Sequence, residues 1–238
     1  MTKLSVNINK VATMRNARGG QIPDVVGFAI DCERFGADGI TVHPRPDERH
    51  ITLDDVMRIA PHITTEFNIE GYPDARYMEI IRSVKPAQAT LVPDPPDVLT
   101  SNTGWNVIDH MQQLKDIIAE IKSYGIRVSI FLNPDIAQVH AAGESGTDRI
   151  ELYTGPYAHE FPTNKTAAIA AYTTAAQTAH QIGLGVNAGH DLNLENLQYF
   201  VTTLACVDEV SIGHALISDA LYYGIENTIQ MYQRKLKV

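Results

Sequence analysis

Eight short apolar segments recur along the chain, and each ends in polar or turn-forming residues. The stretches between them carry apolar residues at the spacing of amphipathic helices. Alternating strands and helices predict a parallel sheet, and eight such units can close into a barrel. We therefore predict an α/β fold, a (β/α)8 TIM barrel, because the sequence lacks the G-x-G-x-x-G turn of the open doubly wound alternative. The eight predicted strand segments are Leu4–Asn9, Gly39–Arg45, Thr65–Gly71, Gln88–Asp94, Arg127–Asn133, Arg149–Gly155, Gly185–Asp191 and Glu209–Ala215.

Capping residues and helix-ending glycines place the helices between these strands. Thr52, followed by Asp54 and Asp55, is typical of a helix start, and Gly36 is typical of the residue after a helix. No linker divides the chain, so one catalytic domain over residues 1–238 is predicted. The predicted helices are Asp24–Phe35, a helix after Thr52, Asp74–Val84, Asn106–Tyr124, Asp135–Ala142, Thr163–Ile182, Asn193–Leu204 and Ser218–Leu236.

Three connections that follow strands are longer than a barrel requires. They are Met14–Pro23, Pro93–Trp105 and Tyr153–Asn164. In a barrel all three would lie at the mouth formed by the carboxyl ends of the strands, where catalysis takes place. We expect them to be loops that serve as lids or substrate clamps.

Composition narrows the class of protein. The 44% apolar fraction suffices for a large core, and the net charge of −9 disfavours nucleic-acid binding. No apolar run approaches the roughly 20 residues of a membrane span, and no leader-like segment follows the first residues, so a soluble cytoplasmic protein is expected. Cys32 and Cys206 are too few for a disulfide framework and are interpreted as buried thiols.

Polar residues gather at the predicted strand ends, although buried parallel strands are usually almost continuously apolar. His43 is well placed there for proton transfer. Apolar neighbours would desolvate Glu70, which raises a carboxyl pKa toward the range of a general acid or base, although an ion pair with Arg45 or Arg18 is an alternative. Glu151 lies within its strand and is expected to be paired, with a cation or a positive intermediate.

Glycine precedes both His190 and His214, and glycine lets a ligand approach the backbone closely. Loops after the seventh and eighth strands often bind phosphate in such barrels. No H-x-x-x-H or H-x-H spacing is present, so no metal is expected, and no P-loop or G-x-S-x-G motif occurs. The residues by themselves indicate a barrel enzyme that performs acid–base chemistry on a phosphorylated small molecule.

Six segments, in order and over essentially the whole chain, resemble the pyridoxine 5′-phosphate synthase family of vitamin B6 biosynthesis. They are NINKVATMRNARGG, GITVHPRPDERHI, FNIEG, RIELYTG, VNAGHDL and SIGHALI, of which RNARG, ITVHxRxDxRHI and NAGH are the most specific. The resemblance implies a TIM barrel with extra helices, a homo-octamer built from dimers, and neither metal nor organic cofactor. It implies condensation of 3-amino-2-oxopropyl phosphate with 1-deoxy-D-xylulose 5-phosphate to pyridoxine 5′-phosphate, phosphate and water.

The resemblance also implies roles for individual residues. His43 and Glu70 match two proton acceptors, His190 matches the proton donor, and Glu151 matches a glutamate that stabilises the transition state. A loop carrying Arg18 is expected to close over the second substrate. The matching substrate contacts are Asn7, Arg18, Gly213 and His214 for the amino-ketone phosphate, and Arg45, His50 and Thr100 for the deoxyxylulose phosphate.

Two places depart from the commoner family pattern. Asn9 and Lys10 stand where that pattern has Asp-His, and Asp191 stands where it has glycine. Asn9 can still hydrogen-bond a sugar hydroxyl, and the point charge of Lys10 can hold phosphate. We expect all three residues to lie beside the substrates.

Two other functions remain open from the residues alone. A phosphosugar isomerase or epimerase on the same barrel would need one phosphate clamp and one acid–base pair, which leaves Arg45 and Thr100 without a role. A non-catalytic phosphate-binding or assembly module would bind a ligand without forming a product. The clustering of His and Glu at the strand ends counts against that module.

Overall fold

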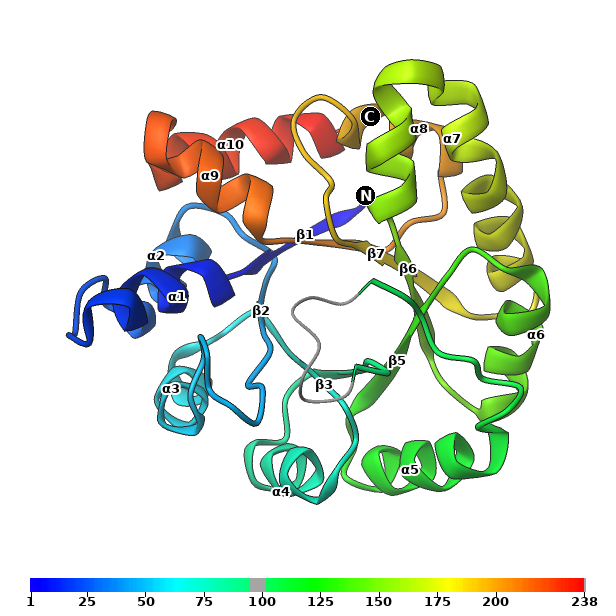
Figure 1. Ribbon diagram of the computed structural model, residues 1–238, viewed down its shortest axis with the longest axis horizontal. Coiled ribbons are helices and arrows are strands. Elements are labelled where there is room, and N and C mark those ends of the chain that lie inside the picture. Colours follow the sequence, from blue (N-terminus) through cyan, green and yellow to red (C-terminus); the bar gives the residue numbers. More distant parts are fainter. Residues whose placement is uncertain (95–101, 238) are drawn as a thin grey trace.

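Eight parallel strands form a closed barrel in the computed structural model, which describes residues 1–94 and 102–237 (Figure 1). Each strand pairs in parallel with its sequence neighbours, and β1 pairs with β8 to close the ring. The predicted barrel is therefore confirmed. The strands are β1 Lys3–Asn7, β2 Gly39–Val42, β3 Glu66–Gly71, β4 Gln88–Leu91, β5 Arg127–Leu132, β6 Arg149–Tyr153, β7 Gly185–Gly189 and β8 Glu209–Ile212.

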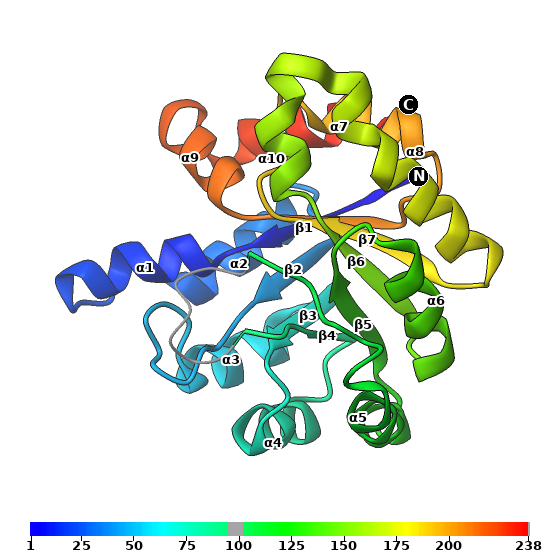
Figure 2. The same ribbon diagram turned by 45° about the vertical axis from the view of Figure 1, so that its right-hand side comes forward.

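Helices surround the barrel, and two of them are additions to the eight-unit plan (Figure 1). After β1 the chain forms α1 before the covering helix α2, and after β8 it forms α9 before α10. Figures 1 and 2 both show α1 projecting outward from the barrel wall. The α-helices of the described residues are α1 Asn9–Arg18, α2 Val25–Arg34, α3 Leu53–Ile59, α4 Ala75–Val84, α5 Met111–Ser123, α6 Ile136–Ser145, α7 Gly155–Gln181, α8 Leu197–Leu204, α9 His214–Tyr223 and α10 Ile225–Leu236.

The hydrophobic core lies between the barrel and its helices. Alternate strand residues such as Val6, Ile40, Ile69, Ile130 and Val186 are fully buried and belong to one apolar cluster with the helix residues. Burying such a side chain contributes about 1.5–3 kcal/mol. The continuous cluster therefore holds the helices against the outside of the barrel.

The strand residues that alternate with these apolar ones point into the barrel, and most of them are polar. The hydroxyl oxygens of Ser5 and Thr41 are 2.7 Å apart, and Asn187 Nδ2 donates to Gln88 Oε1 at 3.3 Å, which joins β7 to β4. Branched apolar side chains usually fill such a barrel. This one has a hydrophilic interior instead. The buried polar strand residues include Ser5, Thr41, Asn68, Gln88, Thr90, Ser129, Glu151, Asn187, Glu209 and Ser211.

Ionic groups occupy the amino-terminal end of the barrel. Glu66 accepts hydrogen bonds from Lys3 and Arg127, and Arg149 Nη1 lies 3.9 Å from Glu209 Oε2. These pairs close the end of the barrel opposite the predicted site with charged groups from β1, β3, β5, β6 and β8. The predicted site residues therefore lie at the opposite end of the barrel, which the carboxyl ends of the strands form.

Local sequence explains where several helices begin. Asp24, Asp74 and Asp135 each accept a hydrogen bond from a backbone N–H in the first turn of α2, α4 and α6. Such caps satisfy donors that a helix start leaves unpaired. The predicted cap at Thr52 is confirmed at the start of α3. Gly36 follows α2 with a φ of 102°, so its predicted position just after a helix is also confirmed.

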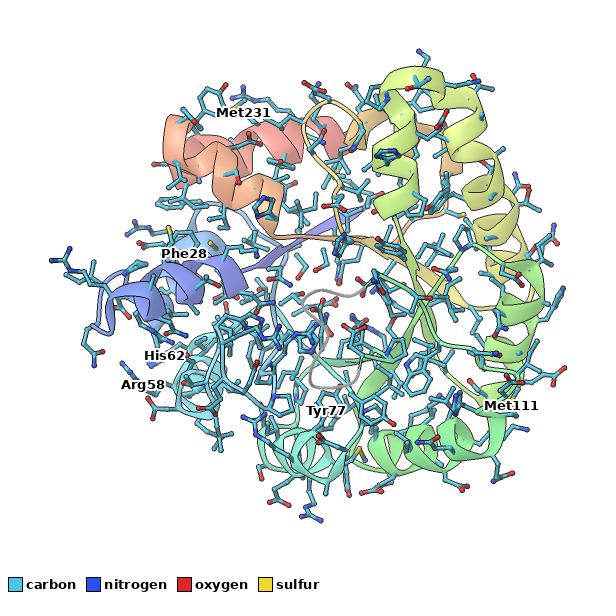
Figure 3. All side chains as sticks on the ribbon, in the orientation of Figure 1. Phe28, Arg58, His62, Tyr77, Met111 and Met231 are labelled. Carbon is cyan, nitrogen blue, oxygen red and sulfur yellow. The ribbon has the colours of Figure 1, made fainter. Side chains whose placement is uncertain are left out.

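Close packing of α4 on β3 depends on a glycine. Figure 3 shows Tyr77 reaching from α4 toward the barrel, where its hydroxyl donates to the carbonyl of Ile69 at 2.9 Å. A Cβ atom on Gly71 would collide with the Tyr77 ring. Glycine at the end of β3 therefore lets the ring cover the strand that carries Glu70.

Several predicted boundaries were wrong. Met14–Arg18 is the second half of α1, so a loop over Met14–Pro23 does not form, and residues 155–164 are helical within α7, which is kinked at Asn164. Helix-forming local hydrogen bonds outweigh the turn-like composition of these segments. Ser218–Leu236 divides into α9 and α10 at Gly224, whose φ is 76°.

Two predicted helices begin a few residues later than expected, and part of one predicted loop lies outside the described residues. The helix predicted from Asn106 begins at Met111, and the one predicted from Asn193 begins at Leu197. The long connection after β4 includes residues 95–101, which lie outside the described residues. Cys32 is buried as predicted, whereas Cys206 is only partly buried. Across residues 1–94 and 102–237, no helix has the length and apolar character that crossing a membrane requires.

The capping box of α3 gives a stability prediction. Asp55 N donates to Thr52 Oγ1 at 3.1 Å, and Thr52 N donates to Asp55 Oδ2 at 2.8 Å. Thr52→Ala leaves the first donor unpaired and is expected to lower the free energy of unfolding by about 1 kcal/mol, measured by urea titration. Thr174→Ala, the same change on the exposed surface of α7, should cause no loss because alanine has the higher helix propensity. Equal losses in both variants would contradict the capping account.

Candidate active site

The end of β1 connects the first candidate residues to one another. Asn7 Nδ2 lies 3.4 Å from Glu70 Oε2, and Asn7 Oδ1 accepts the backbone N–H of Asn9 at 3.1 Å. Asn9 Oδ1 in turn accepts the backbone N–H of His43 at 2.9 Å. The side chains of Asn7 and Asn9 therefore tie the ends of β1, β2 and β3 together.

His43 and Glu70 form the centre of this group. His43 Nδ1 lies 3.7 Å from Glu70 Oε2, and both side chains are largely buried. Burial lowers the pKa of His43 well below 6.5, and the positive charges of Arg45 and Arg49 lower it further. Burial raises the pKa of Glu70 to about 8, with the negative charges of Asp94 and Glu209 assisting and Arg45 opposing. At neutral pH a neutral imidazole therefore faces a mostly protonated carboxyl group.

Arg45 is buried beside a carboxylate that the sequence did not point to. Arg45 Nη2 donates to Asp94 Oδ2 at 2.8 Å, and both side chains are almost fully buried. A cleft lined by His43, Arg45, Arg76, Tyr72 and Asp94 opens at this point. The guanidinium is thus held in place at the edge of the cleft.

The segment from Pro44 to His50 is held by helices on both sides. Arg76 on α4 donates to the carbonyl of Pro44 at 2.7 Å, and Asn16 on α1 donates to the carbonyl of His50 at 2.8 Å. Arg15 pairs with Asp55 on α3 and fixes α1 against that helix. The RNARG motif therefore anchors the segment that carries Arg45 and His50.

His50 lies close to His43, with ring centroids 6.3 Å apart. Burial lowers the pKa of His50 to about 4, and the charges of Arg45, Lys10 and Arg49 act in the same direction. His50 is therefore neutral at physiological pH. A neutral ring beside Arg45 can donate a hydrogen bond to a phosphate or hydroxyl oxygen.

Glu151 is buried in the middle of β6, and its Oε2 has no hydrogen-bond partner among the described residues. A Cβ atom on Gly189 would collide with Glu151 Oε1, so the neighbouring strand end leaves room for this carboxyl group. Burial raises the pKa of Glu151 well above 4.5, and the charges of Glu70 and Glu209 add to the effect. Of the two partners expected for Glu151, no basic side chain of the described residues forms an ion pair with it, so a positive intermediate remains its expected partner.

His190 and Asp191 follow β7. His190 Nδ1 lies 2.7 Å from Asp191 Oδ2, and this hydrogen bond lowers the pKa of Asp191. The ring of Tyr153, at the end of β6, meets the His190 ring edge-on with centroids 5.1 Å apart. His190 therefore stands on the side of the mouth formed by β6 and β7.

The end of β8 completes the rim. Gly213 packs against Asn7, since a Cβ atom on it would stand 3.1 Å from Asn7 Cβ. His214 is exposed as the first residue of α9, a helix start whose backbone N–H groups favour an anion. The start of α9, directly after β8, therefore offers a site for a phosphate group beside Asn7.

Together these contacts show what the mouth can do. Neutral imidazoles and protonated carboxyl groups can take and give protons near neutral pH, and Arg45 and the start of α9 can hold anions. No group of three or more His, Cys, Asp or Glu within residues 1–94 and 102–237 has the arrangement of a metal site.

Comparisons with known proteins identify the family. Residues 4–238 match the model of the family described as pyridoxal phosphate biosynthesis protein PdxJ. The chain is 57% identical to pyridoxine 5′-phosphate synthase of Cytophaga hutchinsonii over 237 residues, covering 100% of both chains. It is 58% identical to the enzyme of that name from Parabacteroides distasonis over 233 residues, covering 98% of both. The chain belongs to the pyridoxine 5′-phosphate synthase family.

Solved structures of low identity show the fold alone. Phosphoribosylanthranilate isomerase from Thermotoga maritima superposes with a TM-score of 0.62 at 14% identity, covering 100% of this chain and 99% of that one. Thiamine phosphate pyrophosphorylase from Pyrococcus furiosus gives a TM-score of 0.63 at 11% identity, covering 99% and 95%. The family model and the relatives of high identity, and not these structures, confirm the family resemblance that the sequence motifs indicated.

The structure places most of the predicted family residues on one rim. Glu70 contacts both His43 and Asn7, and Arg45 and His50 lie next to His43. Glu151 lies within β6, and His190, Asp191, Gly213 and His214 follow the ends of β7 and β8. Asn9 binds the backbone of His43, and Lys10 is exposed beside His50.

Arg18 is not gathered with the rest. Arg18 is the last residue of α1 and is exposed there, about 14 Å of helix beyond Asn9. It therefore lies apart from the mouth of its own barrel and not on a loop above it. Thr100 lies outside the described residues.

Sequence reasoning missed three residues that shape the site. Asp94 pairs with Arg45, Tyr153 packs against His190, and Glu209 adds negative charge in the barrel interior. Burial raises the pKa of Glu209 itself to about 7. Glu209 lies at the start of its strand, at the end of the barrel opposite the mouth, so the sequence pattern did not mark it as a site residue. Asp94 and Tyr153 do stand at strand ends, and that position could have marked them.

The raised pKa of Glu70 predicts a pH-dependent stability. Because its folded-state pKa is about 8 and its ordinary value 4.5, the group stabilises the folded protein fully below pH 4.5, and this contribution is lost as pH rises through 8. Glutamine cannot ionise. Relative to the unaltered protein, Glu70→Gln should therefore gain about 1 kcal/mol or more in unfolding free energy between pH 5.5 and pH 8.5, measured by denaturant titration.

An exposed carboxyl group provides the control for this measurement. Glu144→Gln on the surface of α6 should show the same pH dependence as the unaltered protein. A Glu70→Gln curve parallel to that of Glu144→Gln would contradict the raised pKa.

Proposed function

We propose that this chain condenses 3-amino-2-oxopropyl phosphate with 1-deoxy-D-xylulose 5-phosphate, forming pyridoxine 5′-phosphate, phosphate and water by acid–base catalysis. Membership of the pyridoxine 5′-phosphate synthase family supports the reaction. The single structural observation that carries the proposal is the buried His43–Glu70 pair, 3.7 Å apart at the barrel mouth. Ring formation from an amino-ketone and a keto-sugar needs repeated proton transfers, and such a pair can supply them.

The two groups act as proton acceptors in different ways. His43 is neutral and can take a proton directly. Glu70 is mostly protonated in the free protein, but a substrate ammonium or iminium beside it favours the carboxylate form. Arrival of the amino-ketone therefore prepares Glu70 to act as a base.

Glu151 and His190 serve the later steps. Glu151 has an unpaired carboxyl oxygen within the described residues, and a cationic intermediate would be its partner. His190, on the opposite group of strands, donates a proton to an oxygen that leaves as water. In this proposal the base His43 follows β2, the base Glu70 lies at the end of β3, and the acid His190 follows β7.

Two anion positions would hold the phosphorylated substrates. Arg45 and His50 support the position of the deoxyxylulose phosphate, with Thr100 as a further contact. Asn7, Gly213 and His214, at the start of α9, support the position of the amino-ketone phosphate. Fixing both substrates reduces the entropy cost of their encounter, an advantage of about 7–11 kcal/mol at most.

The direct test is product formation. The purified protein is incubated with both phosphorylated substrates, and the ultraviolet absorption of the new pyridine ring is followed together with phosphate release. Ring absorption and phosphate in equal amounts are expected. Conversion of either substrate alone into an isomer would instead identify a phosphosugar isomerase, and binding without product would identify a non-catalytic module.

Loss of either base should slow this reaction. His43→Ala and Glu70→Gln are each expected to lower kcat by about 100-fold or more while the fold is kept, because each removes one proton acceptor. Circular dichroism checks the fold, and initial rates of ring formation measure the effect. Near-normal rates in a folded variant would remove that residue from the mechanism.

We further propose that the chain assembles as a homo-octamer built from dimers, and that Arg18 serves the site of a neighbouring copy. The exposed position of Arg18 at the tip of the projecting helix α1 supports this arrangement. Pairing of Arg15 with Asp55 fixes the last turn of that helix, so Arg18 cannot fold back into its own barrel mouth without breaking this partly buried ion pair.

Loss of Arg18 should weaken substrate binding. Arg18→Ala is expected to raise the KM for 3-amino-2-oxopropyl phosphate about tenfold or more, because an arginine–phosphate contact is lost. Steady-state kinetics measure the effect, and Arg34→Ala on α2 is the control. An unchanged KM would exclude a role in binding. Mixed assemblies of Arg18→Ala and Glu70→Gln chains should regain activity only if Arg18 acts across an interface between copies.

A further inference from the structure

Two adjacent residues after β7 adopt a backbone conformation that favours glycine. His190 has φ of 79° and Asp191 has φ of 60°, and neither is glycine. Side chains with a Cβ atom adopt this left-handed region at a cost in free energy. Such conformations persist where the surrounding structure enforces them, and they cluster at functional sites.

The neighbouring side chains hold this turn in place. The Thr154 hydroxyl donates to the carbonyl of Gly189 at 2.8 Å and also to the carbonyl of His190. Asn196 Nδ2 donates to the carbonyl of Asp191 at 3.3 Å. Contacts from the start of α7 and from the segment before α8 therefore fix the backbone on both sides of the His190–Asp191 peptide.

The conformation brings two side chains together. His190 Nδ1 and Asp191 Oδ2 are 2.7 Å apart, a charge-assisted hydrogen-bond distance. Tyr153 contacts the ring edge-on, and His214 on α9 is the other titratable group that acts on Asp191. With side-chain exposures of 26% for His190 and 45% for Asp191, the pair remains open to a substrate in the mouth.

We propose that Asp191 is a positioning residue that accepts the Nδ1 proton of His190 and thereby reserves Nε2 of that ring for proton exchange with the substrate. This inference rests on the proposed function, in which His190 donates a proton. The resemblance described above places glycine at this position in the commoner family pattern, so the carboxylate is a feature of this chain. The energetic cost of the left-handed Asp191 is then explained by the hydrogen bond it makes.

The proton step balances without any further reactant. The imidazolium of His190 breaks its Nε2–H bond and gives that proton to a substrate hydroxyl oxygen, whose C–O bond breaks as water leaves. The electron pair of a neighbouring substrate C–H bond forms the new double bond, and the proton of that C–H bond passes to one of the proposed bases, His43 or Glu70. The ring becomes neutral and keeps its Nδ1 proton on Asp191, which stays ionised throughout. A proton taken later from the substrate or solvent by Nε2 restores the imidazolium.

Two variants separate the charge of Asp191 from its backbone conformation. Asp191→Gly removes the carboxylate and relieves the left-handed backbone, so the fold is kept. Asp191→Asn tolerates the left-handed region but has no charge, and its amide can donate to Nδ1 and reverse the position of the ring proton. Ala205→Gly, at another left-handed position after α8, is the matched control for backbone relief alone.

The first readout is the proton position on the ring. In protein labelled with ¹⁵N-histidine, the His190 nitrogen shifts, assigned by loss of the signal in His190→Gln, are expected to show Nδ1–H in the unaltered protein and in Ala205→Gly. Both Asp191 variants should show a lower Nδ1–H population. Unchanged nitrogen shifts in Asp191→Gly would overturn the proposal, and this comparison needs no substrate.

The second readout is kinetic. Both Asp191 variants should lower kcat about tenfold with little change in either KM, while Ala205→Gly keeps the kcat of the unaltered protein. A raised KM with unchanged kcat would overturn the positioning role and assign Asp191 to substrate binding. Absence of product with the unaltered protein would refute the proposed function instead, and the nitrogen shifts would still decide whether Asp191 sets the ring proton.

Discussion

Desolvation of acidic side chains inside a closed barrel is the constraint on which the rest of this structure depends. The barrel satisfies its own backbone hydrogen bonds through the continuous ladder from β1 to β8. Its inward side chains can therefore be polar without leaving backbone groups unpaired. Glu70, Glu151 and Glu209 share this interior, and their burial and mutual repulsion favour the protonated forms. A carboxyl group that is neutral near pH 7 is what acid–base chemistry there requires.

The residues at the carboxyl ends of the strands form a site with two sides above this interior. Asn7 and Asn9 tie the ends of the first three strands together around His43 and Glu70. On the other side, Glu151 lies within β6 and His190 follows β7. In the proposed mechanism, a substrate between the two sides meets proton acceptors on one side and a donor on the other. Rigid strand ends hold both sides, which favours the fixed geometry that multistep proton transfer needs.

Helices outside the barrel contribute to the site through the segments they anchor. Residues from α1 and α4 bind the backbone between Pro44 and His50, and α3 holds α1 through Asp55. The last turn of α1 therefore supports the mouth of its own barrel through Arg15 and Asn16, while Arg18 at the end of the same helix stays exposed.

The sequence by itself determined the order of the strands, the alternation of strands with helices, the barrel and the family. Hydrophobic periodicity and capping residues such as Thr52 report local backbone hydrogen bonding, and the motifs around His43 and His190 are contiguous in the chain. Strand-end position also pointed to Glu70 before any contact was visible. These signals depend on neighbours within a few residues, so the linear pattern contains them.

Only the tertiary structure decided which side chains meet. The pairing of Arg45 with Asp94 joins residues 49 positions apart, and inside the barrel Gln88 and Asn187, far apart in the chain, bind each other. The left-handed turn at Asp191 likewise depends on contacts with other elements. Burial and electrostatics are sums over the whole fold, and a linear sequence does not show which atoms exclude water from a carboxyl group.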